Sequence, residues 1–196
     1  MTSRWREIAV AGHTGDAVAA RSALADCDPV ARELGLGALL RLELLTDEDL
    51  RVSLADPAAP VRRRAAMIAG GRPEVSLHAS LDDPVATVVE AAAWACGEQE
   101  SVDDDVLSKL IDLGVTSADA LVREACVAAL GAIGDPRGLA TILHGCTDKP
   151  AVRRRAVLAL APFDGDAVDA ALQAALTDRD WQVRQAAEDL LRASTD

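Results

Sequence analysis

Hydrophobic positions recur along the chain in a helical pattern that returns about every 30 residues. Each copy opens on an apolar anchor, and the anchors stand at residues 31, 61, 88, 122, 152 and 183. Counted from the anchor, further apolar residues occupy positions 4, 7 and 8, as in Val122, Cys126, Ala129 and Leu130. This spacing places them on one face of an α-helix, and small side chains on that face allow neighbouring helices to approach closely.

A turn rich in Asp and Pro precedes most of these helices, as at Asp56-Pro57 and Asp148-Lys149-Pro150. Asp side chains cap free backbone N–H groups at a helix start, and Pro is tolerated there because it has no N–H. A second helical stretch precedes each turn, and residues 46–49 (Thr46 to Asp49) predict a capping-box start for one of them. The repeating unit is therefore a helix pair, which buries its apolar face only by stacking on other pairs.

This pattern resembles HEAT repeats, in particular the short HEAT repeats of bilin lyases. The motif is Asp-Pro, then Val-Arg, then Ala, and then an apolar residue followed by Gly; the copy from Val122 to Gly131 carries its Val-Arg start and its Leu-Gly end. The resemblance extends from about Asp16 to Ala193. It implies an all-α fold, a right-handed α-solenoid of about six stacked antiparallel helix pairs similar to an armadillo superhelix, and we expect a single domain over residues 1–196.

Three glycines follow the apolar face of their copies, namely Gly70, Gly97 and Gly131. Helices often end in a residue with left-handed backbone geometry, which only Gly adopts at little cost. We therefore expect these glycines to end their helices.

Charge and composition exclude several classes of protein. The chain has 20 Lys and Arg against 32 Asp and Glu, a formal net charge of −12, which opposes binding to nucleic acid. No apolar run approaches the roughly 20 residues of a membrane span, and the first residues have no secretory leader pattern. Four separate cysteines without a CxxC pair are typical of a reducing compartment. We expect an acidic cytoplasmic protein that binds neither nucleic acid nor membrane.

One position of successive repeats holds arginine, at residues 32, 62, 123, 153 and 184. These cations could form a row for an anionic ligand, but turn aspartates recur with them, at residues 26, 56, 119, 148 and 178. We therefore predict a structural ladder in which each Arg bonds the Asp of its own or the adjacent repeat.

No residue pattern predicts catalysis, a metal site or a cofactor site. His13, His78 and His144 lack metal-ligand spacing, and none forms the His-Glu pairs of the HEAT enzymes that hydroxylate a protein lysine. Cys96 and Cys126 fall on apolar helix positions and are expected in the core. A related HEAT-like family excises alkylated DNA bases with Trp and Asp, but the net charge opposes that activity here. We expect no enzyme.

The resemblance implies that the second helix of each pair lines a concave face. An apolar strip on these helices, flanked by basic pairs, is the candidate partner-binding site: Met67, Trp94 and Leu158, with Arg63, Arg64, Arg154 and Arg155. Such a surface suits an acidic and hydrophobic peptide. Alternatively, Met67 and Trp94 fill gaps between helices.

We therefore expect a non-catalytic scaffold that binds a protein or peptide partner and is a monomer or a weak homodimer. Trp181, at the start of the last helix, would then cover the open end of the stack or mark a dimer contact. The resemblance also permits another role, as an accessory factor resembling bilin lyase subunits that assists cofactor attachment to a partner protein. That role predicts bilin binding, which is visible by absorbance.

Overall fold

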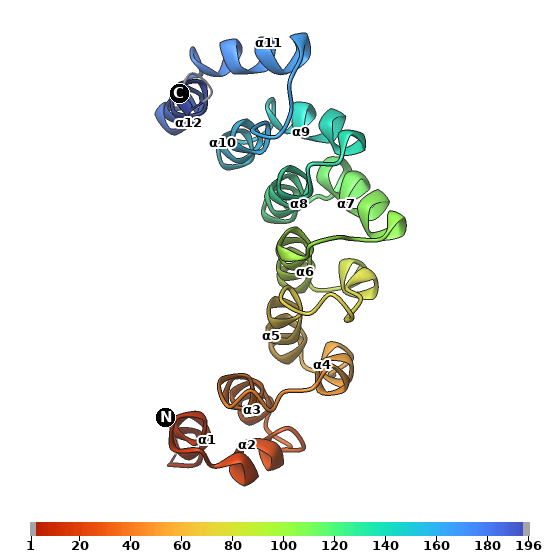
Figure 1. The fold of residues 1–196 in the computed structure, drawn as a ribbon, viewed down its shortest axis with the longest axis vertical. Coiled ribbons are helices and arrows are strands. Elements are labelled where there is room, and N and C mark those ends of the chain that lie inside the picture. The colour runs from red at the N-terminus through yellow and green to blue at the C-terminus, as the bar shows by residue number, and fades with distance from the viewer. Residues whose placement is uncertain (1–2, 194–196) are drawn as a thin grey trace. The chain divides into compact units, whose positions relative to one another are not determined.

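The computed structural model describes residues 3–193, which form helices joined by short turns (Figure 1). Twelve α-helices, two short 3-10 helices and no β-strand are present in this range. The predicted all-α, HEAT-like repeat fold is confirmed. The two ends of the predicted domain, residues 1–2 and 194–196, lie outside the described residues.

The chain divides into two compact units, Met1–Ser76 and Leu77–Asp196. The first unit holds five helices: α1 (Ser3–Thr14), α2 (Ala17–Ala23), α3 (Pro29–Arg41), α4 (Asp47–Leu54) and α5 (Ala59–Ala69). Within it, α3 contacts both α1 and α5 in one row, while α2 and α4 form a second row (Figure 1). One domain over residues 1–196 stays a prediction.

The first helix, α1, lies ahead of the first predicted pair and was not expected. It joins the row because its Gly12 lets it approach α3: a Cβ on Gly12 would lie 2.9 Å from the Cα of Ala38. The indole Nε1 of Trp5 also donates a hydrogen bond of 2.6 Å to the Asp28 carboxylate, which begins α3. The first repeat therefore packs against a further helix, α1, which contacts both α2 and α3.

The second unit alternates between its two rows in the same way. Its elements are η1 (His78–Asp82), α6 (Ala86–Glu98), α7 (Asp104–Thr116), α8 (Ala120–Ile133), η2 (Pro136–Gly138), α9 (Leu139–Gly145), α10 (Pro150–Ala159), α11 (Asp166–Ala175) and α12 (Trp181–Ala193). Helices α6, α8, α10 and α12 pack in succession, and α7, α9 and α11 form the second row (Figure 1). Before the turn that leads into α6, where a helical stretch was predicted, the structure has only a five-residue 3-10 helix, because this repeat is short and Gly71 and Pro73 come just ahead of it.

The helix starts follow the predicted chemistry in part, since α5 and α10, which come after the Asp56-Pro57 and Asp148-Lys149-Pro150 turns, begin without a side-chain cap. Thr46 and Asp49 form a complete capping box at the start of α4. Asp28, Asp103 and Asp119 cap α3, α7 and α8, each accepting a hydrogen bond from a backbone N–H in the first turn. Capping of this kind satisfies N–H groups that have no partner inside the helix.

The predicted Arg/Asp ladder is present within each unit. Its arginines donate Nε and Nη2 to both carboxylate oxygens of an Asp in the next repeat, at 2.6–2.8 Å. The pairs are Arg32–Asp56, Arg123–Asp148 and Arg153–Asp178. The third guanidinium nitrogen, Nη1, donates to a backbone carbonyl of the arginine's own turn, as from Arg153 to Asp148 at 2.8 Å. Each arginine thus ties its own turn to the next repeat.

The fourth ladder position is Ser117, and the prediction of Asp119 there is wrong. The Ser117 carbonyl accepts from Arg123 Nη1 at 2.7 Å, as the Asp56 carbonyl accepts from Arg62. The preceding repeat has Val89 where the others have Arg. Donor and acceptor are therefore replaced together, and a shallow recess of about 370 Å³ lies between Val89 and Ser117.

Restoring this missing ladder pair should couple the two positions energetically. Val89→Arg alone adds a guanidinium without its ladder carboxylate, and Ser117→Asp alone adds a carboxylate without its ladder guanidinium, so we expect each to destabilise the fold. In the double variant we expect a favourable coupling of at least about 1 kcal/mol. Urea unfolding of the four proteins measures this coupling, and additive effects would show that the two positions do not meet.

Of the three glycines predicted to end helices, only Gly70 does so, as the residue directly after α5. Gly97 and Gly131 lie inside α6 and α8, and Gly70 has right-handed geometry, so none has the expected left-handed backbone. The left-handed residue that ends α8 is Gly134, with φ of 69°. A Cβ on Gly131 would lie 2.6 Å from the Cα of Ala159, so this glycine permits the close approach of α8 and α10.

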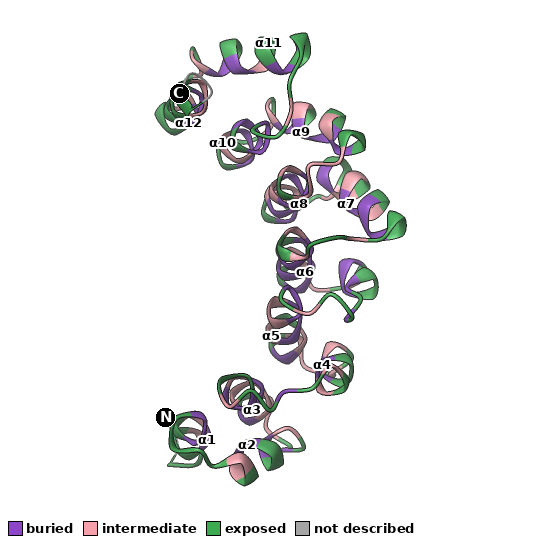
Figure 2. Ribbon diagram, viewed as in Figure 1, coloured by how far each residue is buried: buried purple, intermediate pink, exposed green. Residues whose placement is uncertain are grey.

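The buried faces match the repeat pattern (Figure 2). Val122, Cys126, Ala129 and Leu130 of α8 are all buried. Burial raises the pKa of the Cys126 thiol to about 12, and burial likewise raises that of Cys96 to about 12. Both thiols are therefore protonated at neutral pH, as expected of core cysteines.

Candidate partner-binding groove

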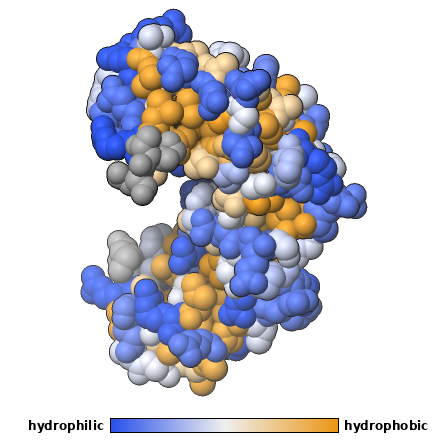
Figure 3. Space-filling model, turned by 45° about the horizontal axis from the view of Figure 1, so that its top comes forward, coloured by the Kyte–Doolittle hydropathy of each residue, from blue (hydrophilic) through white to orange (hydrophobic). Residues whose placement is uncertain are grey.

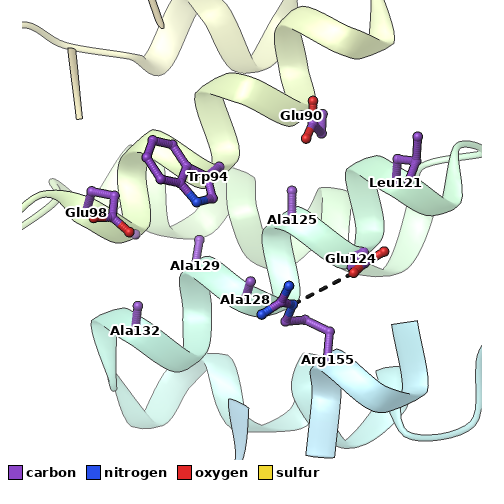
Figure 4. A pocket seen from close by; sticks show the side chains of 11 residues that line it. Glu90, Trp94, Glu98, Leu121, Glu124, Ala125, Ala128, Ala129, Ala132 and Arg155 are labelled. Carbon is purple, nitrogen blue, oxygen red and sulfur yellow. Dashed lines mark ion pairs between the residues drawn. The ribbon is translucent and has the colours of Figure 1, made fainter. Parts of the chain in front are cut away.

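A groove of about 380 Å³ crosses the second unit over helices α6, α8 and α10 (Figure 4). Its floor consists of alanines of α8 and of Gly97 of α6, because the helices approach closely here. The larger residues that line it are Glu90, Trp94, Glu98, Leu121, Glu124 and Arg155. The groove is thus a shallow surface with a floor of small residues and a wall of large ones.

Trp94 is the largest apolar side chain in the groove. Glu90, Trp94 and Glu98 follow one another at intervals of four residues, so they share one face of α6. The Trp94 side chain is 45% exposed, although α6 is otherwise a largely buried helix. On the face that Figure 3 shows, hydrophobic residues reach the surface in patches. Trp94 does not fill a gap in the core, which was the alternative interpretation of this residue.

Carboxylates outnumber cations in this groove. Glu90, Glu98 and Glu124 line it, whereas Arg155 is its one basic residue. The Arg155 guanidinium lies 3.8 Å from the Glu124 carboxylate and forms an ion pair with it (dashed line in Figure 4). Acidic residues therefore predominate in the lining, which favours positively charged groups.

The seven residues of the predicted site fall into two groups. Trp94, Arg154, Arg155 and Leu158 belong to the second unit, whereas Arg63, Arg64 and Met67 lie on α5 of the first unit.

Within the second unit only two of the predicted residues, Trp94 and Arg155, line the groove. Leu158 is 41% exposed on α10, and Arg154 has a buried Nε without a hydrogen-bond partner.

Sequence reasoning missed the acidic wall of the groove. Glu90 and Glu98 stand one helical turn on either side of Trp94, and this spacing could have shown that they share its face. Glu124 and Leu121 come from the next helix of the row, so only the packing of α8 against α6 brings them to the groove.

Other chemistry in the described part of the chain is sparse. Residues 3–193 hold no group of three or more His, Cys, Asp or Glu placed to bind a metal ion. Burial raises the pKa of the Cys146 thiol to about 11, which keeps this thiol protonated at neutral pH. No helix in the same range is both long and apolar enough to cross a membrane.

Comparison with known proteins agrees with this architecture. Residues 107–192 match the family model for HEAT repeats. An engineered protein with a crystal structure is 21% identical, covering 90% of this chain and 95% of its own, with a TM-score of 0.64. Human deoxyhypusine hydroxylase in complex with glycerol is 20% identical, covering 96% of this chain and 78% of its own, with a TM-score of 0.49. No curated protein sequence matches the chain. The predicted resemblance to HEAT repeats is therefore confirmed over residues 107–192.

Proposed function

We propose that this helical repeat protein is a non-catalytic scaffold whose second unit binds a protein segment in the Trp94 groove. The observation that supports the proposal is the half-exposed indole of Trp94 beside a floor of alanines. Exposed aromatic side chains at the centre of a recess are typical anchors of protein interfaces. The protonated thiols of Cys96 and Cys126 favour a role without covalent catalysis.

The energy available from Trp94 is large enough to dominate binding. With 45% of the side chain exposed, covering it removes about 100 Å² of surface from water, worth roughly 2–3 kcal/mol. An apolar side chain of the partner is the natural cover, because the adjoining floor consists of alanines.

The charge of the groove selects the rest of the partner segment. Three carboxylates and one guanidinium line it, so we propose a segment with a basic residue beside its apolar anchor. An acidic segment was expected from Arg63, Arg64, Arg154 and Arg155, but only Arg155 of these lines the groove, and it is paired with Glu124.

Replacing Trp94 tests the groove. Peptides selected from a random displayed library on the full chain should combine a large apolar residue with Lys or Arg. We expect Trp94→Ala to weaken the selected peptides by roughly 20-fold or more, as removal of an interface anchor does. Fluorescence polarisation with labelled peptides measures the change.

Trp181→Ala is the matched control, because Trp181 is 64% exposed on α12 and does not line the groove. It should leave peptide affinity unchanged. Equal losses in the two variants, or selected peptides with Lys or Arg whose binding ignores Trp94, would contradict the proposed site.

A further inference from the structure

A second recess, of about 410 Å³, lies entirely in the first unit. It is formed by α1, α3 and α5, and three of its lining residues carry basic groups, namely His13, Arg41 and Arg64. One carboxylate, Glu33, lines it, together with small and apolar residues such as Ala9 and Leu34. Its charge is therefore opposite to that of the Trp94 groove.

The two guanidinium groups of this recess lack partners. Neither Arg41 nor Arg64 makes an ion pair or a side-chain hydrogen bond with any residue in the range 3–193. The chain as a whole has 32 acidic residues for 20 Lys and Arg, so carboxylates are plentiful. Other arginines of this unit are paired, as Arg32 is with Asp56 and Arg21 with Asp49. Unpaired cations that line one recess repel each other, and an incoming anion would relieve this repulsion.

Two glycines make room for these guanidinium groups. Arg41 Nη1 lies 3.3 Å from the point where a Cβ on Gly12 would stand, and Arg64 Nη2 lies 3.3 Å from the same point on Gly37. Each arginine therefore extends across a glycine of the preceding helix in the row. A larger residue at either glycine would displace the guanidinium. The positions of both cations therefore depend on the absence of a side chain at Gly12 and at Gly37.

We propose that this recess binds an acidic side chain of a protein segment, with the carboxylate held between Arg41 and Arg64. A guanidinium donates paired N–H groups in the geometry that a carboxylate accepts, which favours this anion. Ala9, Leu34 and Ala38 supply apolar surface for the flanking part of the segment. The inference rests on the proposed scaffold function in taking the occupant to be protein, but it concerns a different site.

The test measures binding of the full chain to a short fluorescein-labelled peptide of alternating glutamate and leucine. A counterpart with glutamine in place of glutamate has the same shape without charge. We expect the glutamate peptide alone to bind, and the Arg41→Gln, Arg64→Gln double variant to bind it at least roughly tenfold more weakly. Gly37→Leu, which keeps every charge but fills the recess, should weaken binding similarly.

The matched control is the Arg6→Gln, Arg51→Gln double variant. It removes the same charge from exposed positions of the first unit that do not line the recess. Its affinity for the glutamate peptide should equal that of the unchanged chain. An equal loss in this control, or equal binding of the glutamine peptide, would overturn the proposal.

Two further measurements distinguish the alternatives. In the first, inorganic phosphate competes with the labelled glutamate peptide. If phosphate displaces this peptide as effectively as unlabelled glutamate peptide does, the recess binds small anions, and a protein segment as its occupant is overturned. Peptides selected on the Trp94 groove should keep their affinity in the Arg41→Gln, Arg64→Gln variant. If this double variant loses the glutamate peptide but still binds the peptides selected on the Trp94 groove, the result supports this site independently of that groove.

Discussion

Arg153→Met is expected to lower the free energy of unfolding by about 2–4 kcal/mol, because it leaves a partly buried carboxylate without its donors. The Arg153 side chain is 7% exposed and donates two hydrogen bonds of 2.8 Å to Asp178, whose side chain is 16% exposed. Arg153 also donates a hydrogen bond to the Asp148 carbonyl of its own turn. The substitution therefore removes the links both to this turn and to the next repeat. Urea unfolding followed by far-UV circular dichroism measures the loss.

Arg155→Met is the matched control, with the same substitution two residues further along α10. The Arg155 side chain is 41% exposed, and its Nε lies 3.8 Å from the Glu124 carboxylate, which is too far for a hydrogen bond. We therefore expect this pair to contribute less than about 1 kcal/mol. Equal losses in the two variants would show that the ladder contributes no more than a surface ion pair.

The difference between Arg153→Met and the unchanged chain should depend on pH. Hydrogen bonds from Arg153 hold the pKa of the Asp178 carboxyl below its usual value, against the opposing effect of burial. Because the folded pKa is lowered, this stabilisation is fully present above the unfolded value of about 3.9 and is lost as the pH falls below it. The difference in stability should therefore shrink on acidification. A constant difference would mean that Arg153 acts through packing alone.

Gly131→Ala is expected to lower the free energy of unfolding by about 2–3 kcal/mol, although Ala is the better helix former by about 1 kcal/mol. The added Cβ would lie 2.5 Å from the Cβ of Ala159 and 2.6 Å from its Cα. Backbone atoms cannot turn aside as a flexible side chain can, so α8 and α10 must move apart. The same unfolding measurement tests this expectation.

Two further glycines, with longer Cβ contacts, provide a graded test of this prediction. A Cβ on Gly97 would lie 2.9 Å from the Cα of Ala129, so Gly97→Ala should be less damaging than Gly131→Ala. A Cβ on Gly37 would meet only the end of the Arg64 side chain, at 3.3 Å, so Gly37→Ala should leave stability unchanged or raise it by up to about 1 kcal/mol. Identical effects at all three positions would show that helix propensity, and not close approach, decides them.

Local patterns determined much of this fold without reference to tertiary contacts. The apolar spacing from Val122 to Leu130 predicted a buried helix face, and Thr46 with Asp49 predicted a capping box, because both depend on residues one helical turn apart. The repeat of arginine and aspartate predicted the ladder, since identical units place identical residues in identical contacts. Where the repeat was irregular, at Ser117, the same reasoning assigned the wrong acceptor.

The sequence by itself therefore determined the helix pairs, their buried faces and the chemistry that joins one repeat to the next. Tertiary structure alone decided the role of Gly131, because close approach depends on which helix lies across it. It alone also brought Glu124 of α8 to the face of Trp94, and set Arg41 of α3 beside Arg64 of α5. The net charge of a groove is the sum over side chains from several helices. A pattern along one helix does not show which side chains of the other helices contribute to it.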